Sequence, residues 1–310
     1  MADVLCFGNL QFDVLCRTVT ALPPPGGLRM IDAIDFALSG NGGNVAASLA
    51  KLGISVELAG YSGADTVGEQ FRTTLEEMGV DTTTLLRHPT ASTGTSIITL
   101  SSNGERSVLF VNGANALFDL STVPDSQLYE KRVVSVSSLF VLPQFTGKAV
   151  AALFARARSY GAITILNICW DTQGQGLAYL LPALAETDYF VLSYDEGCQL
   201  TRQSSIEKIV AELKSHTRGT VLLTLGSEGC SFYAENILQK IAAVPVEATD
   251  CTGAGDSFLA GFIAGIVSGQ SVYDAASLAC QVASFAVTGP GAYPRIPLLK
   301  EILRFSNHNK

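Results

Sequence analysis

Strand-length apolar runs alternate with helix-length amphipathic segments along most of this chain, and this alternation is the strongest constraint on its fold. In the second half, the runs predict strands at residues 133–142, 163–168, 189–192 and 221–225, and helices at residues 148–160, 177–185 and 206–216. Strands joined by helical crossovers are typical of βαβ units, which pack as a mostly parallel sheet with helices on both faces. The sequence therefore predicts a doubly wound α/β fold.

The elements at the two ends of the chain fit the same fold. The N-terminal pattern predicts strands at residues 3–8 and 54–61, and helices at residues 45–52 and 68–78. The C-terminal pattern predicts short antiparallel strands at residues 231–234 and 239–244, and helices at residues 255–268, 272–288 and 297–305.

Two segments break the alternation. Residues 14–38 contain a Pro-Pro-Pro-Gly-Gly run and show no helical period. Residues 94–111 alternate apolar and polar side chains around a Ser-Asn-Gly turn at 102–104, which indicates a β-hairpin. We predict that both segments form a small β-sheet lid over a site, and that the α/β core comprises residues 1–13, 39–93 and 112–310.

Composition excludes several classes of protein. The chain has 310 residues, 47% of them hydrophobic, and a formal net charge of −8, which favours a large core and argues against nucleic acid as a partner. The apolar runs have strand lengths, so no membrane span is expected, and the N-terminus lacks the pattern of a signal peptide. Seven scattered cysteines without CxxC spacing are expected to be reduced, mostly buried thiols. We therefore expect a cytoplasmic protein.

Residues 250–258 read Asp-Cys-Thr-Gly-Ala-Gly-Asp-Ser-Phe, between a strand-like run and an apolar helix. Thr252 is a possible cap of that helix. Asp256 places a carboxylate in its first turn, which is unfavourable beside a phosphate unless Asp256 takes a proton during phosphoryl transfer. Alternatively, the glycines only start the helix and Asp256 favours its dipole. Three residues present backbone N–H groups at the positive end of the helix, where anions bind: Gly253, Ala254 and Gly255.

Residues 39–44 read Ser-Gly-Asn-Gly-Gly-Asn and precede the helix predicted at 45–52. Gly42 and Gly43 allow the backbone to approach a ligand closely. The Asn44 amide can both accept a hydrogen bond from a sugar hydroxyl and donate one to it. Its alternative role is to cap the helix, and the two roles are compatible.

Three further motifs follow predicted strands, where open α/β sheets bind ligands. Asp13 follows the first strand and is either a ligand-binding residue or a turn aspartate. Thr224, Gly226 and Gly229 lie in a glycine-bearing loop that suits backbone contact with a nucleotide, although an ordinary turn has the same composition. Glu196 begins a helix and can hold magnesium through water, or it can act only as a helix-start acid.

Two of these motifs together resemble a known family. Residues 250–258 closely resemble the C-terminal signature of the PfkB, or ribokinase-like, carbohydrate kinases, and residues 39–53 resemble the N-terminal signature. Residues 65–80, 224–226 and 291–292 resemble further stretches of the family, in the same order. The resemblance covers essentially the whole chain and implies a ribokinase-like fold, whose lid closes over the sugar and in several relatives makes a homodimer.

The resemblance also implies roles for individual residues. Asp256 matches the base that activates the acceptor hydroxyl, and the three residues before it match an anion hole. The implied acceptor-binding residues are Asp13, Gly42, Gly43 and Asn44. The implied ATP-binding residues are Ser193, Thr224, Gly226 and Gly229. The implied metal contacts are Glu196 for Mg²⁺ through water, and Asp250, Thr252 and Gly291 for a monovalent cation, usually K⁺.

The chain departs from the family pattern at four positions. Ser193 stands where the family usually has the Asn of an Asn-x-x-Glu motif, so metal or phosphate handling is expected to differ. Cys251 replaces the commoner Thr, and Ser39 replaces the first glycine of the N-terminal signature. Cys280 stands where many relatives have an Asn beside the adenine.

The predicted function is an ATP-dependent, magnesium-requiring kinase that phosphorylates a hydroxyl of a sugar, as ribokinases and fructokinases do. One alternative is a nucleoside kinase of the same family that acts on adenosine-like acceptors. Another is a catalytically silent sugar or nucleotide sensor. A Rossmann-type oxidoreductase is disfavoured because GxGxxG is absent after the first predicted strand.

Overall fold

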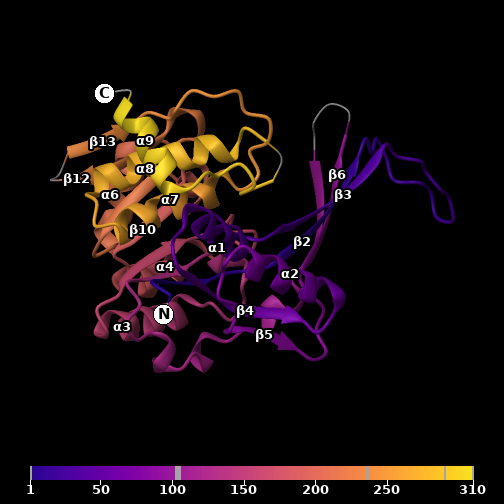
Figure 1. The fold of residues 1–310 in the computed structure, drawn as a ribbon, viewed down its shortest axis with the longest axis horizontal. Coiled ribbons are helices and arrows are strands. Elements are labelled where there is room, and N and C mark those ends of the chain that lie inside the picture. The colour runs from indigo at the N-terminus through magenta and orange to yellow at the C-terminus, as the bar shows by residue number, and fades with distance from the viewer. Residues whose placement is uncertain (1, 102–105, 235–236, 290, 309–310) are drawn as a thin grey trace.

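The computed structural model describes residues 2–101, 106–234, 237–289 and 291–308. These residues form a large sheet of nine strands between layers of helices, and a separate sheet of four strands (Figure 1). The large sheet has the order β13-β12-β11-β10-β9-β8-β1-β4-β5. Its strands are β1 (Val4–Phe7), β4 (Val56–Gly63), β5 (Leu85–His88), β8 (Val133–Val136), β9 (Ile163–Asn167), β10 (Tyr189–Ser193), β11 (Thr220–Thr224), β12 (Cys230–Ala234) and β13 (Ile237–Ile241).

Pairing in the large sheet confirms the mostly parallel prediction. β1 lies inside the sheet, parallel to β4 on one side and to β8 on the other. Among the described strands of this sheet, the antiparallel pairs are β11–β12 and β12–β13, at one edge. All four residues of β1 are buried, because helices cover both faces of a parallel sheet.

The helices divide between the two faces of the large sheet. Successive side chains of a strand point to opposite faces, so Val4 and Cys6 join one buried cluster and Leu5 and Phe7 join the other. The first cluster packs against α1 (Asn41–Leu52), α2 (Thr66–Glu77), α7 (Ala254–Val267), α8 (Val272–Ala286) and α9 (Leu299–His308). The second packs against α3 (Gly147–Ser159), α4 (Gly176–Ala185), α5 (Tyr194–Thr201) and α6 (Ile206–His216).

Several predicted boundaries are wrong. The strand predicted at 133–142 ends at Val136, because Ser138 adopts a left-handed backbone (φ 63°) and a 3₁₀ turn follows at Leu139–Val141. The strand predicted at 239–244 ends at Ile241. The sequence analysis did not predict β5, a four-residue strand at the edge of the sheet whose two middle residues are exposed, so its apolar pattern is short.

The small sheet contains both segments predicted as a lid. Its order is β3-β2-β6-β7, with a parallel β2–β6 pair joining two antiparallel pairs. β2 and β3 extend beyond the predicted lid borders, so the division of the chain into core and lid stays a prediction. The predicted turn at 102–104 lies outside the described residues. The strands are β2 (Gln11–Arg17), β3 (Ala33–Ser39), β6 (Thr95–Leu100) and β7 (Arg106–Val111).

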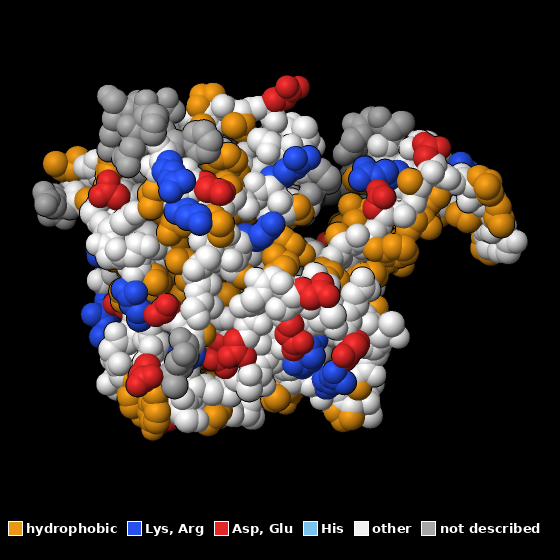
Figure 2. Space-filling model, viewed as in Figure 1, with side chains coloured by type: hydrophobic (Ala, Val, Ile, Leu, Met, Phe, Trp, Pro, Cys, Tyr) orange, Lys and Arg blue, Asp and Glu red, His pale blue; other side chains and the backbone are white. Residues whose placement is uncertain are grey.

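The small sheet extends from the body of the molecule as an arm (Figure 1). Apolar side chains lie along it in the space-filling view (Figure 2). Its exposed large apolar residues are Ile34, Phe36, Ile97, Val108, Leu109, Phe110 and Val111.

Two composition-based expectations can be compared with the structure. Within the part of the chain that the structure describes, no helix has both the length and the apolar character needed to cross a membrane. All seven cysteines are free, as expected. The prediction that most of them are buried is wrong, because three of the seven are buried, Cys6, Cys230 and Cys280. Three others are partly buried, and Cys251 is exposed.

Candidate active site

The Asp256 carboxylate lies where the two glycine-rich motifs meet. Asp256 is the third residue of α7 and only 6% exposed. Asn41 Nδ2 donates a hydrogen bond to Asp256 Oδ1, and Asn44 Nδ2 donates one to Oδ2, both at 2.8 Å. Each carboxylate oxygen therefore has an amide donor from α1.

The early start of α1 brings both asparagines to the carboxylate. The helix was predicted from residue 45, but it begins at Asn41, with Gly40 as the N-cap. Asn41 and Asn44 are therefore three positions apart in the helix and share one face. The alternative that Asn44 caps the helix is wrong, because Asn44 lies inside the first turn.

Close packing of backbone on backbone fixes the start of α1. A Cβ atom on Gly42 would lie 2.7 Å from the backbone of Gly8, at the end of β1. Any side chain at Gly42 would push α1 away from the sheet and would move Asn41 and Asn44 with it. The structure thus indicates a packing role for Gly42 in addition to its predicted contact with the acceptor.

A buried hydroxyl orients Asn41. Ser138 Oγ lies 2.7 Å from Asn41 Oδ1 and 2.8 Å from Asn9 Oδ1, and the Asn41 N–H donates to Asn9 Oδ1 at 3.0 Å. A hydroxyl donor at Asn41 Oδ1 leaves the Nδ2 group of Asn41 facing Asp256. The sequence analysis missed Asn9, Asn41 and Ser138. Asn41 lies within the glycine-rich motif and could have been found from an earlier helix start, whereas nothing in the sequence marked Ser138.

The environment of Asp256 raises its pKa to about 6. Burial is the largest cause, because it disfavours the charged form, and the negative charge of Glu196 adds to it. The hydrogen bonds from Asn44 and Asn41 favour the charged form and partly oppose this rise. A carboxylate with a pKa close to neutral is suited to accept and release a proton.

The first turn of α7 differs in detail from the prediction. Thr252 does not cap the helix, because Gly253 is the N-cap in a left-handed conformation (φ 71°), and a Cβ there would lie 2.1 Å from that of Ala292. The Ala254 N–H, predicted to be free, donates to the carbonyl of Cys251 at 3.2 Å. Gly255 faces open space, since a Cβ there would meet nothing within 4 Å.

The structure brings together the three residues assigned to a monovalent cation. Asp250 Oδ1 accepts a hydrogen bond from the Thr252 N–H at 2.9 Å, and Asp250 Oδ2 accepts one from the Gly291 N–H at 3.1 Å. Burial raises the pKa of Asp250, but these hydrogen bonds and the charge of Arg17 outweigh it, so the pKa lies below its usual value. An ionised carboxylate beside two loops is a suitable oxygen ligand for a cation.

The residues predicted to bind the acceptor lie among polar groups with unused hydrogen-bonding capacity. Asp13 is buried on β2 and accepts a hydrogen bond from the Ser96 hydroxyl, and burial raises its pKa. Gln11, two residues earlier on the same face of β2, is 5% exposed, and both polar atoms of its side chain lack a partner among the described residues. Asn44 Oδ1 also lacks a described partner. The sequence analysis missed Gln11.

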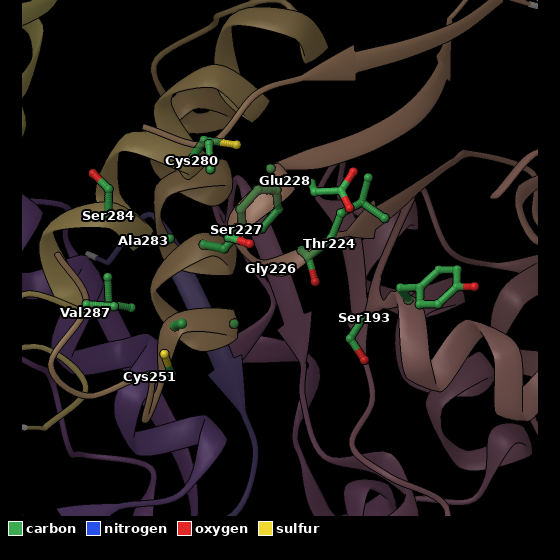
Figure 3. Close-up of a pocket in the computed structure, with 18 of the residues that line it drawn as sticks. Ser193, Thr224, Gly226, Ser227, Glu228, Cys251, Cys280, Ala283, Ser284 and Val287 are labelled. Carbon is green, nitrogen blue, oxygen red and sulfur yellow. The ribbon is translucent and has the colours of Figure 1, made fainter. Parts of the chain in front are cut away.

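A separate cleft adjoins the start of α7 and has a volume of about 1160 Å³. All four predicted ATP-binding residues line it: Ser193, Thr224, Gly226 and Gly229. Figure 3 shows Cys280, Ala283 and Ser284 along α8, with Val287 directly after the helix, on one side, and Gly226, Ser227 and Glu228 across from them. Ala254 and Gly255 also line this cleft, whereas Asp13, Asn44 and Asp256 do not. The first turn of α7 therefore lies between the cleft and the residues predicted to bind the acceptor.

The charges around the cleft are acidic. Asp195, Glu207 and Glu228 line it, and none of its described lining residues is a lysine or an arginine. Negative phosphates in this cleft therefore need backbone N–H groups, the positive end of α7 or bound cations for stabilisation.

Glu196 forms a capping box with Ser193. The Ser193 N–H donates to Glu196 Oε2 at 2.8 Å, and the Glu196 N–H donates to Ser193 Oγ at 3.2 Å. Burial raises the pKa of Glu196. Across the described residues, no group of three or more His, Cys, Asp or Glu side chains could hold a metal. A single carboxylate still fits Mg²⁺, which is usually bound by one or two carboxylates, substrate phosphates and water.

Comparison with known proteins identifies the family. Residues 1–298 match the pfkB family of carbohydrate kinases, so the chain belongs to this family, as its two signatures predicted. Members of the family are phosphotransferases that act on sugar hydroxyls, and the predictions of a kinase and of ATP binding are confirmed.

Individual relatives include both sugar and nucleoside kinases. The chain is 28% identical over 295 residues to a nucleoside kinase of Methanothermobacter thermautotrophicus, covering 95% of this chain and 92% of the relative. It is 27% identical over 317 residues to a ribokinase of Schizosaccharomyces pombe, covering 97% of each. The structure of Arabidopsis thaliana ribokinase complexed with ribose and ATP matches with a TM-score of 0.88 at 24% identity, covering 98% of each chain. This likeness confirms the predicted fold.

Replacing Asn41 with alanine should raise the pKa of Asp256 above its value of about 6 in the parent protein. The change removes one of the two amide donors to the charged carboxylate, and a hydrogen bond to an ionised group contributes roughly 1.5–3 kcal/mol. Carbon-13 NMR titration of the Asp256 side-chain carboxyl measures this directly. The carboxyl of Asp125, which is paired with Arg156, provides an internal reference that should not change. An unchanged or lower pKa of Asp256 would show that Asn41 does not stabilise the carboxylate.

Proposed function

We propose that this protein transfers the γ-phosphoryl group of ATP to a hydroxyl of a sugar, with Asp256 as the general base. The observation that carries the proposal is the position of Asp256. Asp256 is a buried carboxylate with a pKa of about 6, and the side-chain amides of Asn41 and Asn44 donate hydrogen bonds to it. It lies in the same helical turn as Ala254 and Gly255, which line the large cleft. Family membership supports phosphoryl transfer as the reaction.

Asp256 takes the proton of the attacking hydroxyl in this proposal. Each of its oxygens accepts one amide hydrogen bond and keeps a second lone pair, so a hydroxyl can donate without displacing Asn41 or Asn44. The positive end of α7, with the backbone N–H groups of Gly253 and Gly255, stabilises negative charge on the transferred group, whereas the Ala254 N–H is already bonded to the Cys251 carbonyl. General-base assistance of this kind typically contributes about 100- to 10,000-fold to the rate.

Cations complete the proposed nucleotide site, because the described lining of the cleft has no basic side chain. Glu196, acting through water, is the residue proposed to hold Mg²⁺, which when bound would neutralise charge on the nucleotide phosphates. Asp250, Thr252 and Gly291 are the residues proposed to hold K⁺ beside the start of α7. Ser193, Thr224, Gly226 and Gly229 would contact ATP in the cleft.

The proposed acceptor is a small sugar of the ribose or fructose type. Asp13, Gln11 and Asn44 are buried polar residues, and Gln11 and Asn44 have atoms without described partners, which suits an acceptor with several hydroxyls. Gly42 and Gly43 allow close approach of such an acceptor. A nucleoside is the second candidate, and the similarity to the nucleoside kinase of Methanothermobacter thermautotrophicus favours it.

Replacing Asp256 with asparagine should lower kcat by at least about 100-fold while ATP still binds, because the proton acceptor is lost. In the parent protein, kcat/KM should fall as the pH drops below about 6, where Asp256 becomes protonated. Steady-state kinetics over a pH series and calorimetric titration with ATP measure both effects. Asp274→Asn, the same change at an exposed carboxylate at the start of α8, is the matched control and should retain activity. Near-parental turnover of Asp256→Asn would rule out the base assignment.

A screen for ADP release should identify the acceptor. Pentoses, hexoses, sugar acids, sugar phosphates and nucleosides are compared with Mg-ATP, with and without K⁺. We expect the highest kcat/KM with a pentose or a ketohexose, and a higher value with K⁺ than without it. A nucleoside with the highest value would favour the second candidate. Saturable binding of an acceptor with no turnover of any compound would favour a silent sensor.

We also propose that the arm forms a homodimer. Exposed apolar side chains lie on β3 and β7, including Phe36 and Leu109 at 67% and 65% exposure, and a second copy would remove them from water. Sedimentation velocity should therefore give about twice the monomer mass of 32.6 kDa, and Leu109→Glu should give the monomer. A monomeric parent protein at micromolar concentration would contradict the proposal.

A further inference from the structure

Two free thiols meet beside the nucleotide cleft. Cys230 is the first residue of β12, and Cys280 lies in the middle of α8. Their sulfur atoms are 3.8 Å apart, and both residues are buried. Neither thiol takes part in the proposed phosphoryl transfer.

The pair joins the two walls of the cleft. Cys280 lines the cleft on α8, where it shares one helical face with Ala283 (Figure 3). Cys230 follows Gly229 directly, at the end of the loop that forms the opposite wall. A covalent bond between the sulfurs would therefore link helix α8 to the loop that the proposed function assigns to ATP.

The two thiols differ in access and in acidity. Cys280 is 6% exposed and reaches the cleft, whereas Cys230 is 0% exposed and does not line it. A small oxidant in the cleft therefore meets Cys280 first. The neighbouring Cys230 thiol stabilises the Cys280 thiolate and lowers the pKa of Cys280, although burial opposes this. Cys280 is thus the attacking sulfur, and Cys230 is the sulfur that completes the disulfide.

We propose that Cys230 and Cys280 form a dithiol modification site for hydroperoxide oxidants, and that their disulfide reversibly closes the nucleotide cleft. The Cys280 thiolate attacks one peroxide oxygen, the O–O bond breaks, and a sulfenic acid and water form. The Cys230 sulfur then attacks the Cys280 sulfur, the S–O bond breaks, and a second water leaves. Two thiols lose two electrons in total, and one hydrogen peroxide becomes two waters.

The disulfide must change the shape of the cleft. A disulfide bond is about 2.0 Å long, so the two sulfurs must approach by well over 1 Å from their present separation of 3.8 Å. Helix α8 is packed closely against α7, since a Cβ atom on Gly261 would lie 2.8 Å from Ala279 Cα. Cys280 is held on α8 and Cys230 directly follows the loop of the opposite wall, so we expect the new bond to draw the two walls together and to narrow the space between them. We therefore expect weaker binding of ATP.

The experiment treats the reduced 310-residue chain with hydrogen peroxide and maps its disulfides by mass spectrometry of a non-reduced digest. We expect a Cys230–Cys280 linked peptide, with the free thiols falling from seven to five. Calorimetric titration should show at least tenfold weaker ATP binding, restored by dithiothreitol. Bound ATP covers Cys280 and should slow the oxidation.

Cysteine variants separate this site from other oxidation. Cys230→Ala lacks the second sulfur but keeps every residue of the cleft lining, so it should bind ATP when reduced and should form no disulfide with Cys280. Cys251→Ala removes the exposed cysteine of the same cleft and should still form the Cys230–Cys280 disulfide. Melting temperatures of the reduced proteins check folding, and Cys230→Ser, which also keeps the cleft lining, replaces Cys230→Ala if the latter does not fold.

Two results would overturn the proposal. One is the absence of a Cys230–Cys280 disulfide in the oxidised native chain, and the other is a disulfide that leaves ATP affinity unchanged. The proposal rests on the nucleotide-binding part of the proposed function and not on its acceptor. If ATP binds but no acceptor is phosphorylated, the proposed reaction fails while the redox result still stands.

Discussion

The hydrogen bonds from Asn41 and Asn44 to Asp256 join two glycine-rich helix starts that lie more than 200 residues apart in the chain. A buried carboxylate without donors would be strongly unfavourable, so the packing of α1 against α7 and the ionisation of Asp256 depend on each other. Gly42 and Gly253 make this possible, because a side chain at either position would overlap backbone or a neighbouring residue. The residues predicted to bind the acceptor, the cleft and the loop around Asp250 are all arranged around this contact.

The electrostatics of the site follow from the same arrangement. Burial and the charge of Glu196 disfavour the ionised form of Asp256, and the two amides compensate only partly, which leaves its pKa close to neutral. The neighbouring cleft carries carboxylates and, among its described residues, no basic side chain. Phosphate binding in such a site depends on helix N-termini, backbone N–H groups and cations rather than on lysine or arginine.

Sequence patterns predicted the family, the parallel sheet and most helices, because apolar periodicity and glycine-rich signatures are local properties. They were less accurate where a turn or a distant contact decides the structure. Periodicity could not place the start of α1 at Asn41, since that turn is held by packing on Gly8. Apolar periodicity also predicted a strand over residues 133–142 that in the structure ends at Val136. The left-handed backbone of Ser138 turns the chain there, and the Ser138 hydroxyl contacts Asn9 and Asn41.

The sequence by itself determined the class of fold, the family and the identity of the acidic residue at the start of α7. Only the tertiary structure decided which side chains surround that residue. Asn41, Ser138 and Gln11 became part of the site, and Cys230 met Cys280, through contacts between segments far apart in the chain. Local patterns fix the elements, because backbone conformation and burial depend on neighbouring residues. Contacts between side chains that are far apart in the chain depend on how those elements pack, and apolar periodicity does not predict that packing.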